Sequence, residues 1–517
     1  MRPEAYDHPV RSVEIIETHI SWILLTGSWA YKIRKPVHLG FVDFSTAARR
    51  RFCAEEELRL NRRLVADLYL DLVPVHGPPE AASLRGNGPV IDCAVRMRQF
   101  SQSDLLSCCL EEGRAPAAAA ITQLADDLAR FHTSAAVAGA GADPGWGEPE
   151  LVRAPVRTNL EVLETCPLVR DRLKGLRQWS EEHYVELRPH LAARKAAGLV
   201  REGHGDLHLG NLVWWQGRIT PFDCLEFNPS LRWIDVISDI AFLAMDLAQH
   251  RRPDLASLLL SRWLETGGDH LGLHTWRWYL SYRALVRAKV ACLRLRQDGL
   301  SRSEQQRLET ELDTYLRLAE DLSQQPRPLL LITHGLSGSG KSHWAQRIAT
   351  RPGWIQLRSD VERLRLFGLW GLNLLHQTPL HGDRYAPAIS EHLYSTLLPQ
   401  KAAAVLAAGL SLVVDATFLR REERQRFAAL ASQAGAGFAI LDCRCSKPEA
   451  LARIEARRAR GGDPSEADGA VLEQQCRWIE PLQEDEQRHA FVCNDHLNNG
   501  SPAASDGGLE DWLAARS

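Results

Sequence analysis

Lysine and methionine are scarce in this sequence, and its charges almost cancel. Only eight of the 62 basic residues are lysines, so a lysine inside a phosphate-binding motif stands out against an arginine-rich background. The net charge of −3 gives no general reason to expect a nucleic-acid or anionic-membrane partner. With 517 residues, 45% hydrophobic and 25% charged, the chain has the composition of a globular protein of two or three domains.

Long apolar runs and regular cysteine patterns are also absent. The longest uncharged apolar stretch lies between Lys401 and Asp415, which is too short to span a bilayer, and the N-terminal residues lack the apolar core of a signal peptide. The 11 cysteines are irregularly spaced, without a pair of CxxC motifs, so no zinc site is expected. These features predict a cytoplasmic protein with reduced thiols and no membrane segment.

The pattern of β-forming and helix-forming residues divides the chain. The first hundred residues are strand-rich, a mainly helical pattern runs from about Pro116 to residue 323, and a β-like interlude interrupts it at 211–227. In the first part the predicted strands are 13–17, 21–25, 29–34 and 90–97, and the predicted helix is 46–65. Residues 138–145 are rich in glycine and alanine and predict a loop.

The pattern of predicted secondary structure changes after Ser323-Gln-Gln-Pro-Arg-Pro, which is the best candidate for a linker between domains. Short apolar runs then alternate with helical segments, which is typical of a parallel sheet covered by helices on both faces. These runs are 329–333, 354–357, 412–414 and 438–441. We expect an α+β domain at 1–322 (small lobe about 10–100, helical lobe 101–322), an α/β domain at 328–498 and a loose tail at 499–517.

A P-loop motif, Gly335-Leu-Ser-Gly-Ser-Gly-Lys-Ser, follows the first predicted strand of the second domain and opens a helix. Gly335, Gly338 and Gly340 let backbone N–H groups curl around phosphate oxygens. Lys341 is expected to reach the β- and γ-phosphates of ATP, and Ser342 to offer its hydroxyl to Mg²⁺. The motif therefore predicts an ATP and Mg²⁺ site.

Two aspartates follow later strands of the same domain. Asp415 ends the strand 412–414 and is a candidate Mg²⁺ ligand through water. Asp360 follows the strand 354–357, at the sheet edge where ligands bind; its alternative role is the N-cap of the next helix. Farther on, the segment 450–460 carries several arginines that could close over phosphates, with a solvated helix face as the alternative.

This second part resembles the small P-loop kinases that include polynucleotide kinase, chloramphenicol phosphotransferase and zeta-toxin-like enzymes. The matching elements are the P-loop, Ser359-Asp360-x-x-Arg363, Asp415-Ala-Thr417 and a lid from Arg453 to Asp463. The resemblance implies Asp360 as a general base and Arg363 as a substrate contact. It also implies that lid arginines, Arg453 and above all Arg457, contact the nucleotide and the transferring phosphoryl group.

The first part contains a second constellation, His204-Gly-Asp206-Leu-His-Leu-Gly-Asn211, followed by Asp223. The sequence 212–219 predicts a hairpin, which would bring Asn211 close to Asp223. Asp206, Asn211 and Asp223 would then converge around Mg²⁺-ATP. Lys32, on a predicted strand, and Glu57, on the next helix, complete a kinase-like set, with Lys35 as the alternative lysine.

The first part, about 10–320, resembles the aminoglycoside phosphotransferase and choline kinase superfamily. The resemblance implies a protein-kinase-like fold, Asp206 as the catalytic base, Asn211 and Asp223 as Mg²⁺ ligands, and Lys32 on the phosphates, paired with Glu57. Two departures are Asp223-Cys-Leu in place of a DFG motif and the lack of a glycine-rich loop, whose place the turn at Glu17-Thr-His would take. Asp235 and Asp239 are expected to anchor the catalytic loop.

Together these motifs predict a bifunctional phosphotransferase with two ATP and Mg²⁺ sites, which transfers the γ-phosphate to a hydroxyl of a small molecule or nucleotide. One alternative is that one kinase-like domain senses ATP and regulates the other. Another is 5′-hydroxyl phosphorylation of polynucleotides by the second domain, which its arginines allow and the net charge does not favour. The motifs specify neither the acceptor nor the oligomeric state.

Overall fold

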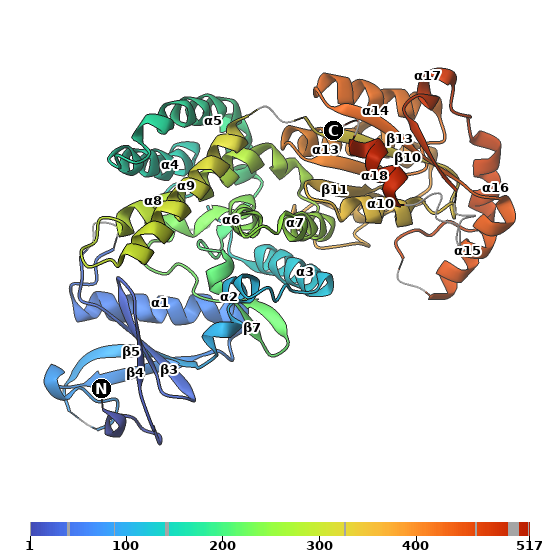
Figure 1. Cartoon of the computed structure of the whole chain (residues 1–517). Helices are drawn as coiled ribbons and strands as arrows, with labels where there is room; N and C mark the ends of the chain where they lie inside the picture. The colour runs from blue at the N-terminus through green and yellow to red at the C-terminus, as the bar shows by residue number, and fades with distance from the viewer. Residues whose placement is uncertain are drawn as a thin grey trace.

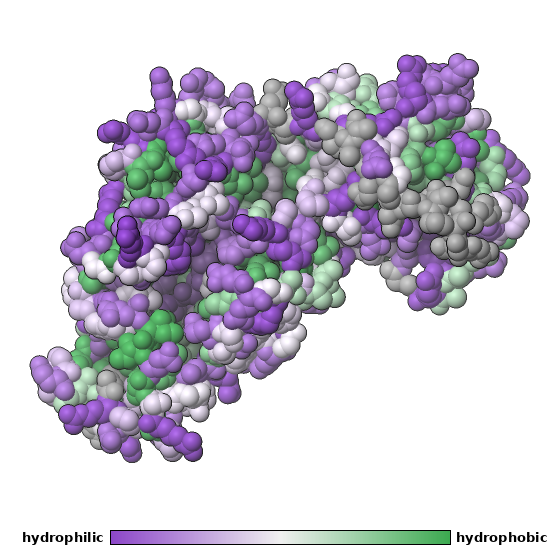
Figure 2. Space-filling view, in the orientation of Figure 1, coloured by the Kyte–Doolittle hydropathy of each residue, from purple (hydrophilic) through white to green (hydrophobic). Residues whose placement is uncertain are grey.

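The computed structural model describes residues 2–38, 42–86, 88–139, 144–324, 327–460, 463–494, 506–514 and 516. A β-rich lobe lies at one end of the molecule, helices form the middle, and an α/β part lies at the other end (Figure 1). Within these residues no helix is both long and apolar enough to cross a membrane. The face in Figure 2 is mostly hydrophilic, with separate hydrophobic patches.

The small lobe is a five-stranded antiparallel sheet in the order β1-β2-β3-β5-β4. Its elements are β1 Glu14–Glu17, β2 Ser21–Leu25, β3 Trp29–Arg34, α1 Ala47–Val65, β4 Tyr69–His76 and β5 Val90–Arg98. The four predicted strands and the helix are confirmed. Strand β4 was not predicted, because Pro74 interrupts it and its side chains do not alternate regularly between buried and exposed.

Helix α1 connects the small lobe to the rest of the domain. The hydroxyl of Thr46 caps it by accepting a hydrogen bond from the Arg49 backbone N–H at 3.3 Å. Its buried face includes Leu60 and Asn61, and also the carboxylate of Glu57, which is fully buried. A fully buried carboxylate requires charged or hydrogen-bonding partners, so this helix points toward a polar site.

The helical lobe packs around α6 Val236–Gln249, in which twelve consecutive residues are buried. The other helices are α2 Leu106–Glu111, α3 Ala118–Ser134, α4 Pro149–Glu164, α5 Leu173–Ala196, α7 Pro253–Gly267, η7 His270–Thr275, α8 Trp276–Arg294 and α9 Arg302–Ser323. Two short antiparallel pairs, β6 Val200–Glu202 with β9 Trp233–Asp235 and β7 Leu212–Trp215 with β8 Arg218–Pro221, lie among them. In the loop predicted at 138–145, residues 140–143 lie outside the described part.

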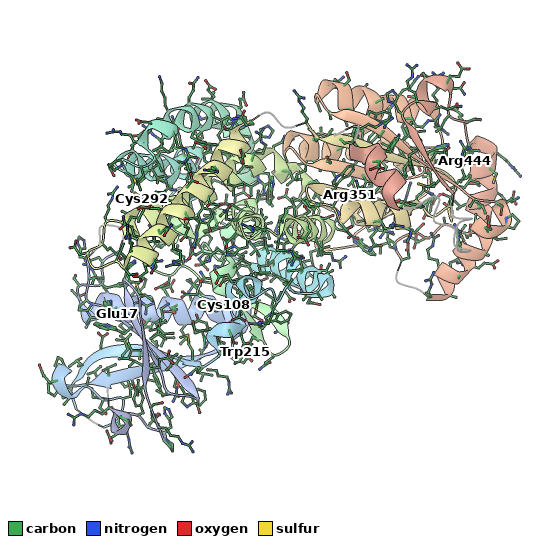
Figure 3. All side chains as sticks on the ribbon, viewed as in Figure 1. Glu17, Cys108, Trp215, Cys292, Arg351 and Arg444 are labelled. Atoms are coloured by element: carbon green, nitrogen blue, oxygen red, sulfur yellow. The ribbon has the colours of Figure 1, made fainter. Side chains whose placement is uncertain are left out.

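The predicted hairpin is formed by β7 and β8. Gln216 and Gly217 have φ of 49° and 81°, the left-handed conformations that tight two-residue hairpins require. Trp215, labelled in Figure 3, lies beside the small lobe, and its indole N–H donates to the Asp67 carboxylate at 2.9 Å. The hairpin therefore braces the lobe junction and fixes the chain on both sides of the turn.

The second part is a parallel five-stranded sheet in the order β11-β12-β10-β13-β14. Its strands are β10 Leu329–His334, β11 Trp354–Arg358, β12 Ser411–Asp415, β13 Gly437–Arg444 and β14 Ala490–Asn494. Its helices are α10 Lys341–Ala349, α11 Ser359–Leu366, α12 Pro387–His392, η8 Leu393–Leu397, α13 Leu398–Ala407, α14 Arg421–Gln433, α15 Lys447–Arg460, α16 Gly469–Trp478 and α17 Glu484–Gln487. The predicted doubly covered parallel sheet is confirmed, and β14 is an additional edge strand.

The expectation of a loose tail is wrong for part of residues 499–517. Residues Asp506–Ala514 form helix α18, in which Leu509 is 5% exposed and Leu513 1% exposed. Trp512 packs beside Phe491 of β14, with the ring centroids 5.3 Å apart. The helix was not predicted because small and polar residues precede it and its apolar face is short. This face covers the sheet beside β14.

The two parts share a polar interface. The N–H of Gly353 donates to the Ser257 hydroxyl at 2.7 Å, and that of Gln356 to the Ser261 hydroxyl at 3.3 Å, so α7 lies against the start of β11. Residues of both parts also belong to one continuous hydrophobic cluster. The second part is therefore docked against the helical lobe.

We expect the stability of the protein to depend on pH because His270 is buried in this interface. Burial, and next Lys401, lower its pKa from the ordinary 6.5 to about 3. Below pH 6.5, His270 binds a proton in the unfolded chain but stays neutral in the folded chain. The free energy of unfolding should therefore fall as the pH drops from 6.5 toward 3. The slope should reach about 1.4 kcal/mol per pH unit. Urea unfolding of His270→Gln at pH 7, 6 and 5 should lack this component, whereas the exposed His381→Gln should keep it; equal slopes in both variants would contradict the prediction.

Candidate functional site

The P-loop joins the fully buried strand β10 to helix α10. Its glycines have φ of 139° at Gly335, 81° at Gly338 and 90° at Gly340, which side chains disfavour. A Cβ at Gly335 would lie 2.3 Å from the Cys443 carbonyl oxygen, and one at Gly338 would lie 2.4 Å from that of Ala450. The loop therefore needs glycine at these positions for both conformation and space.

Lys341 and Asp415 are buried at the base of this loop. The Lys341 ammonium donates to the Leu336 carbonyl oxygen at 2.6 Å, and burial lowers its pKa. Burial raises the pKa of Asp415, while Arg358 and the Ser342 hydroxyl act in the opposite direction. A lysine whose hydrogen-bond acceptor is a backbone carbonyl can exchange that acceptor for a charged phosphate, which forms the stronger bond.

A cavity of about 1040 Å³ lies beside the P-loop. It is as large as the largest common ligand pockets, of roughly 1,000 Å³. Its walls bring together residues that the sequence placed in separate motifs: Lys341, Ser342, Asp360, Arg363, Asp415, Arg453 and Arg457. The cavity therefore has a phosphate-binding wall at the P-loop and a second wall around α11.

Asp360 occupies the second position of α11, which begins at Ser359, and Arg358 is the N-cap residue. The alternative role of Asp360 as the helix cap is therefore wrong, because the helix begins one residue before it. A carboxylate in the first turn still complements the helix dipole. Asp360 lines the cavity and keeps its place as the candidate base.

Arg363 is held in place at the second wall. Its guanidinium donates to the Arg384 carbonyl oxygen at 2.9 Å and to the Ser390 hydroxyl at 3.2 Å. The Tyr385 ring lies 4.9 Å from it, a cation–π contact. Sequence reasoning missed several residues that also line the cavity: Tyr385, Glu391, Tyr394, Arg420, Glu423 and Gln475. They belong to no motif, and only the fold brings them to this wall.

The predicted lid, Arg453 to Asp463, begins in the middle of α15, and α16 follows it along the same side of the P-loop. Arg453 donates to the Gly338 carbonyl oxygen at 3.5 Å, and Arg457 to that of Ala467 at 3.2 Å. The Gln475 side chain bonds to Ser337 twice, accepting from its backbone N–H at 2.8 Å and donating to its hydroxyl at 3.0 Å. The lid is thus in contact with the P-loop; Gly461 and Gly462 lie outside the described residues.

The N-terminal constellation also converges. The Lys32 ammonium donates to Glu57 at 2.9 Å and to Asp223 at 2.6 Å. Lys35 instead pairs with Glu17 at the surface, so Lys32 is the lysine of this site. Asp223 has φ of 61°, a left-handed conformation that is uncommon for a non-glycine residue and marks a constrained position.

Asp206 lies beside Asn211, as the spacing predicts. The Asn211 amide donates to the Asp206 backbone oxygen at 2.9 Å and to its carboxylate at 3.1 Å. Burial opposes ionisation, but the nearby His208 and His204 hold the pKa of Asp206 well below its usual range. Asp206 is therefore a carboxylate, the form that accepts a proton.

Asp239 holds the loop that carries Asp206. Its carboxylate accepts from the backbone N–H of His204 at 2.7 Å and of Gly205 at 3.0 Å. Burial acts against ionisation, yet the hydrogen bond with His132 and the nearby charge of Arg283 lower the pKa of Asp239 to about 2. Asp235 caps α6 by accepting from the Ile237 N–H at 3.0 Å. The expectation that these aspartates anchor the loop is confirmed for Asp239, whereas the Asp235 side chain caps α6 and pairs with Arg194 instead.

One charged pair at this site was not predicted. Arg34, 2% exposed, donates to Glu57 at 2.6 Å and to Glu226 at 2.7 Å. Glu226 belongs to the segment that departs from the DFG motif, so this segment is tied to β3 and α1 by an ion pair. Alternation on β3 places Lys32 and Arg34 on one face, a signal that could have suggested the pair.

The turn between β1 and β2 is tight and contains no glycine. The Thr18 N–H donates to the Ser21 carbonyl oxygen at 2.9 Å. Glu17 lies at the end of β1 that faces the helical lobe (Figure 3), and the neighbouring His19 is 3.3 Å from the Gln297 amide. The turn therefore bridges the two lobes.

The fold and the cavity define the C-terminal part as a P-loop nucleotide-binding domain, and residues 330–482 match the family model of an AAA domain. Over nearly its whole length the chain is similar to an uncharacterized protein of Mycobacterium tuberculosis (Rv2004c), with 30% identity over 480 residues, 91% of this chain and 92% of the relative. A protein of Mycobacterium bovis matches to the same extent. The chain belongs to the family of these mycobacterial proteins.

Two solved structures are also similar. A choline/ethanolamine kinase family protein from Mesorhizobium loti is 13% identical, with 61% of this chain and 94% of that chain covered and a TM-score of 0.33. The APS kinase of Mycobacterium tuberculosis, solved with AMPPNP and APS, is 20% identical, with 37% and 99% covered and a TM-score of 0.25.

Proposed function

We propose that this chain is an ATP-dependent phosphotransferase with two nucleotide sites, and that the C-terminal cavity transfers the γ-phosphate to a hydroxyl of a small molecule or nucleotide. The observation that carries the proposal is the cavity of about 1040 Å³, which has the P-loop on one wall and Asp360 with Arg363 on another. A motor ATPase needs no second polar wall beside its phosphate loop, whereas a kinase needs room for an acceptor.

The residues at the P-loop fit a bound nucleotide. The Ser339 hydroxyl is buried and has no hydrogen-bond partner within the described part of the chain, and a phosphate oxygen would provide one. Lys341 would contact the phosphates, and Ser342 with Asp415 would hold Mg²⁺, partly through water. The metal would neutralise developing charge; Asp360 would accept the acceptor's hydroxyl proton, and Arg457 would contact the transferring group.

The N-terminal site supports a second nucleotide. Lys32 and Glu57 form the ion pair that orients a lysine toward phosphates, and Asn211 and Asp223 supply oxygen ligands that suit Mg²⁺. In this site Asp206 would act as the base. The ion pair between Lys32 and Asp223 and the tight β1–β2 turn favour, as a second candidate, a regulatory ATP sensor.

Calorimetric titration with Mg²⁺-AMPPNP tests the two sites. We expect the wild-type chain to bind two equivalents of nucleotide, and Lys32→Ala and Lys341→Ala to bind one each. Each variant loses the charge-assisted bonds of one lysine to the phosphates, which should lower the affinity of that site about 10–100-fold. The control Lys447→Ala, a half-exposed lysine paired with Glu473, should keep both.

Transfer itself is tested by mass spectrometry of polyols, amino sugars and nucleosides incubated with ATP. A phosphorylated product that disappears in Lys341→Ala supports the C-terminal kinase. Nucleotide binding without any product from either site would reject phosphoryl transfer in favour of the sensor.

A further inference from the structure

The acceptor-side segment, residues 359–386, has two faces. One face carries Asp360, Arg363 and Tyr385 to the cavity wall. The other lies on the helical lobe, where Glu362 is 2% exposed and Arg365 9% exposed. Side chains that would position an acceptor and side chains that contact the first domain therefore alternate along one short helix, α11.

Buried charges join α11 to the first domain. The Lys401 ammonium, on α13, donates to the Glu362 carboxylate at 2.5 Å and to the Gly268 carbonyl oxygen at 3.1 Å. Arg365 donates to the same carboxylate at 3.2 Å and to the Thr266 carbonyl oxygen at 3.3 Å. The carbonyls at the end of α7 thus complete the hydrogen bonding of two buried cations of the second domain.

The rest of the segment is anchored in the same way. The Leu372 N–H donates to the Thr266 carbonyl oxygen at 2.8 Å, and Leu374 is fully buried. Arg201 donates to the Leu374 carbonyl oxygen at 3.2 Å and lies 2.8 Å from the His376 ring nitrogen. Arg201 belongs to β6, the strand that leads into the Asp206 loop.

The packing leaves no free space at two of these anchors. A Cβ at Gly268 would lie 2.9 Å from Cδ of Arg365, and one at Gly371 would lie 2.4 Å from the Thr266 carbonyl oxygen. Fixing a catalytic wall by buried, fully paired groups is what precise positioning of an acceptor requires. In the described part of the chain, by contrast, the hydrogen bonds of the P-loop residues 335–342 stay within the second domain, to Leu336, Thr417 and Gln475.

We propose that the N-terminal domain is the structural support of the acceptor wall, and that Lys401 and Glu362 are positioning residues that hold Asp360 and Arg363 in place through α11. The acceptor wall is the cavity wall that carries Asp360, Arg363 and Tyr385, and calling it so rests on the proposed function. The contacts that support this wall do not depend on that function. A change in the first domain is therefore expected to loosen the acceptor side of the second domain and to leave its nucleotide side unchanged.

Two glycines of the first domain provide a matched test. Gly268 and Gly299 both have φ of 83°, so alanine strains the backbone equally; only at Gly268 does the new Cβ press on Arg365, since nothing lies within 4 Å at Gly299. In the full chain, Gly268→Ala should raise hydrogen exchange in peptides of residues 359–376 about tenfold, whereas Gly299→Ala should leave it within about twofold. Equal exchange in the two variants would overturn the proposal.

Lys401 tests the same support from the second domain. Lys401→Met should raise exchange in residues 359–376 about tenfold, and Lys401→Arg, which keeps the charge, should restore much of the protection. The affinity of the P-loop for Mg²⁺-AMPPNP, measured in a Lys32→Ala background, should change less than about twofold. If the nucleotide affinity falls with the protection, the effect is general unfolding and the positioning role is rejected. The exchange readout stands even if wild-type protein transfers no phosphate.

Discussion

Replacing Asp206 by Asn is expected to lower ATP turnover at the N-terminal site by about 10²–10⁴-fold, the contribution of a positioned general base. The Asp206 carboxylate is ionised, lies 3.1 Å from the Asn211 amide, and is 37% exposed. Asparagine preserves the size of the side chain but cannot accept the hydroxyl proton. The substitution should therefore remove chemistry and keep nucleotide binding.

The measurement is ADP release at steady state in a Lys341→Ala background, in which the P-loop site no longer contributes. Asp254→Asn is the matched control, because Asp254 is a half-exposed carboxylate of α7 that pairs with Arg252. Unchanged turnover in Asp206→Asn would reject Asp206 as the base, and bound nucleotide without any turnover in the Lys341→Ala background would assign the N-terminal site to ATP sensing.

Replacing Arg194 by Met is expected to destabilise the first domain by about 3–5 kcal/mol, the cost of leaving buried charges without a partner. Arg194 donates to Asp235 at 2.6 and 2.7 Å and to Asp269 at 2.7 and 3.0 Å. The two carboxylates are only 2% and 1% exposed. Methionine fills much of the same volume, so the loss isolates the charge.

Urea unfolding at pH 7 measures this loss. The control Arg252→Met removes a partly exposed ion pair with Asp254 and should cost about 0–1 kcal/mol. A loss below 1 kcal/mol for Arg194→Met would show that Asp235 and Asp269 are satisfied by backbone N–H groups alone.

The sequence predicted the parts of both sites that are local in the chain. The P-loop, Asp360 and Asp415 each follow a strand of a parallel sheet, and the hairpin β7–β8 joins Asn211 to Asp223, so spacing alone places them. The pairing of Lys32 with Glu57 came from the resemblance to a kinase-like set, and the structure confirms it.

Residues that meet only through long-range packing could not be predicted. Tyr385 and Glu391 reach the cavity from the segment between α11 and α13, which contains no motif, and the Arg194 and Lys401 clusters join residues that lie 39 to 133 positions apart. Asp360 was assigned an alternative role as helix cap because helix ends are uncertain by one or two residues from sequence. Helix α18 was missed because its apolar face is short and follows a glycine- and serine-rich stretch.

The interface also constrains the order in which the chain acquires its structure during synthesis. The first domain leaves the ribosome before residues 359–386 exist, so Arg201 and the carbonyl groups at the end of α7 must remain hydrated until the second domain follows. Docking then replaces that water with Leu374, Arg365 and Lys401. The contacts that support the acceptor wall can therefore form only after residues 359–401 have been synthesised.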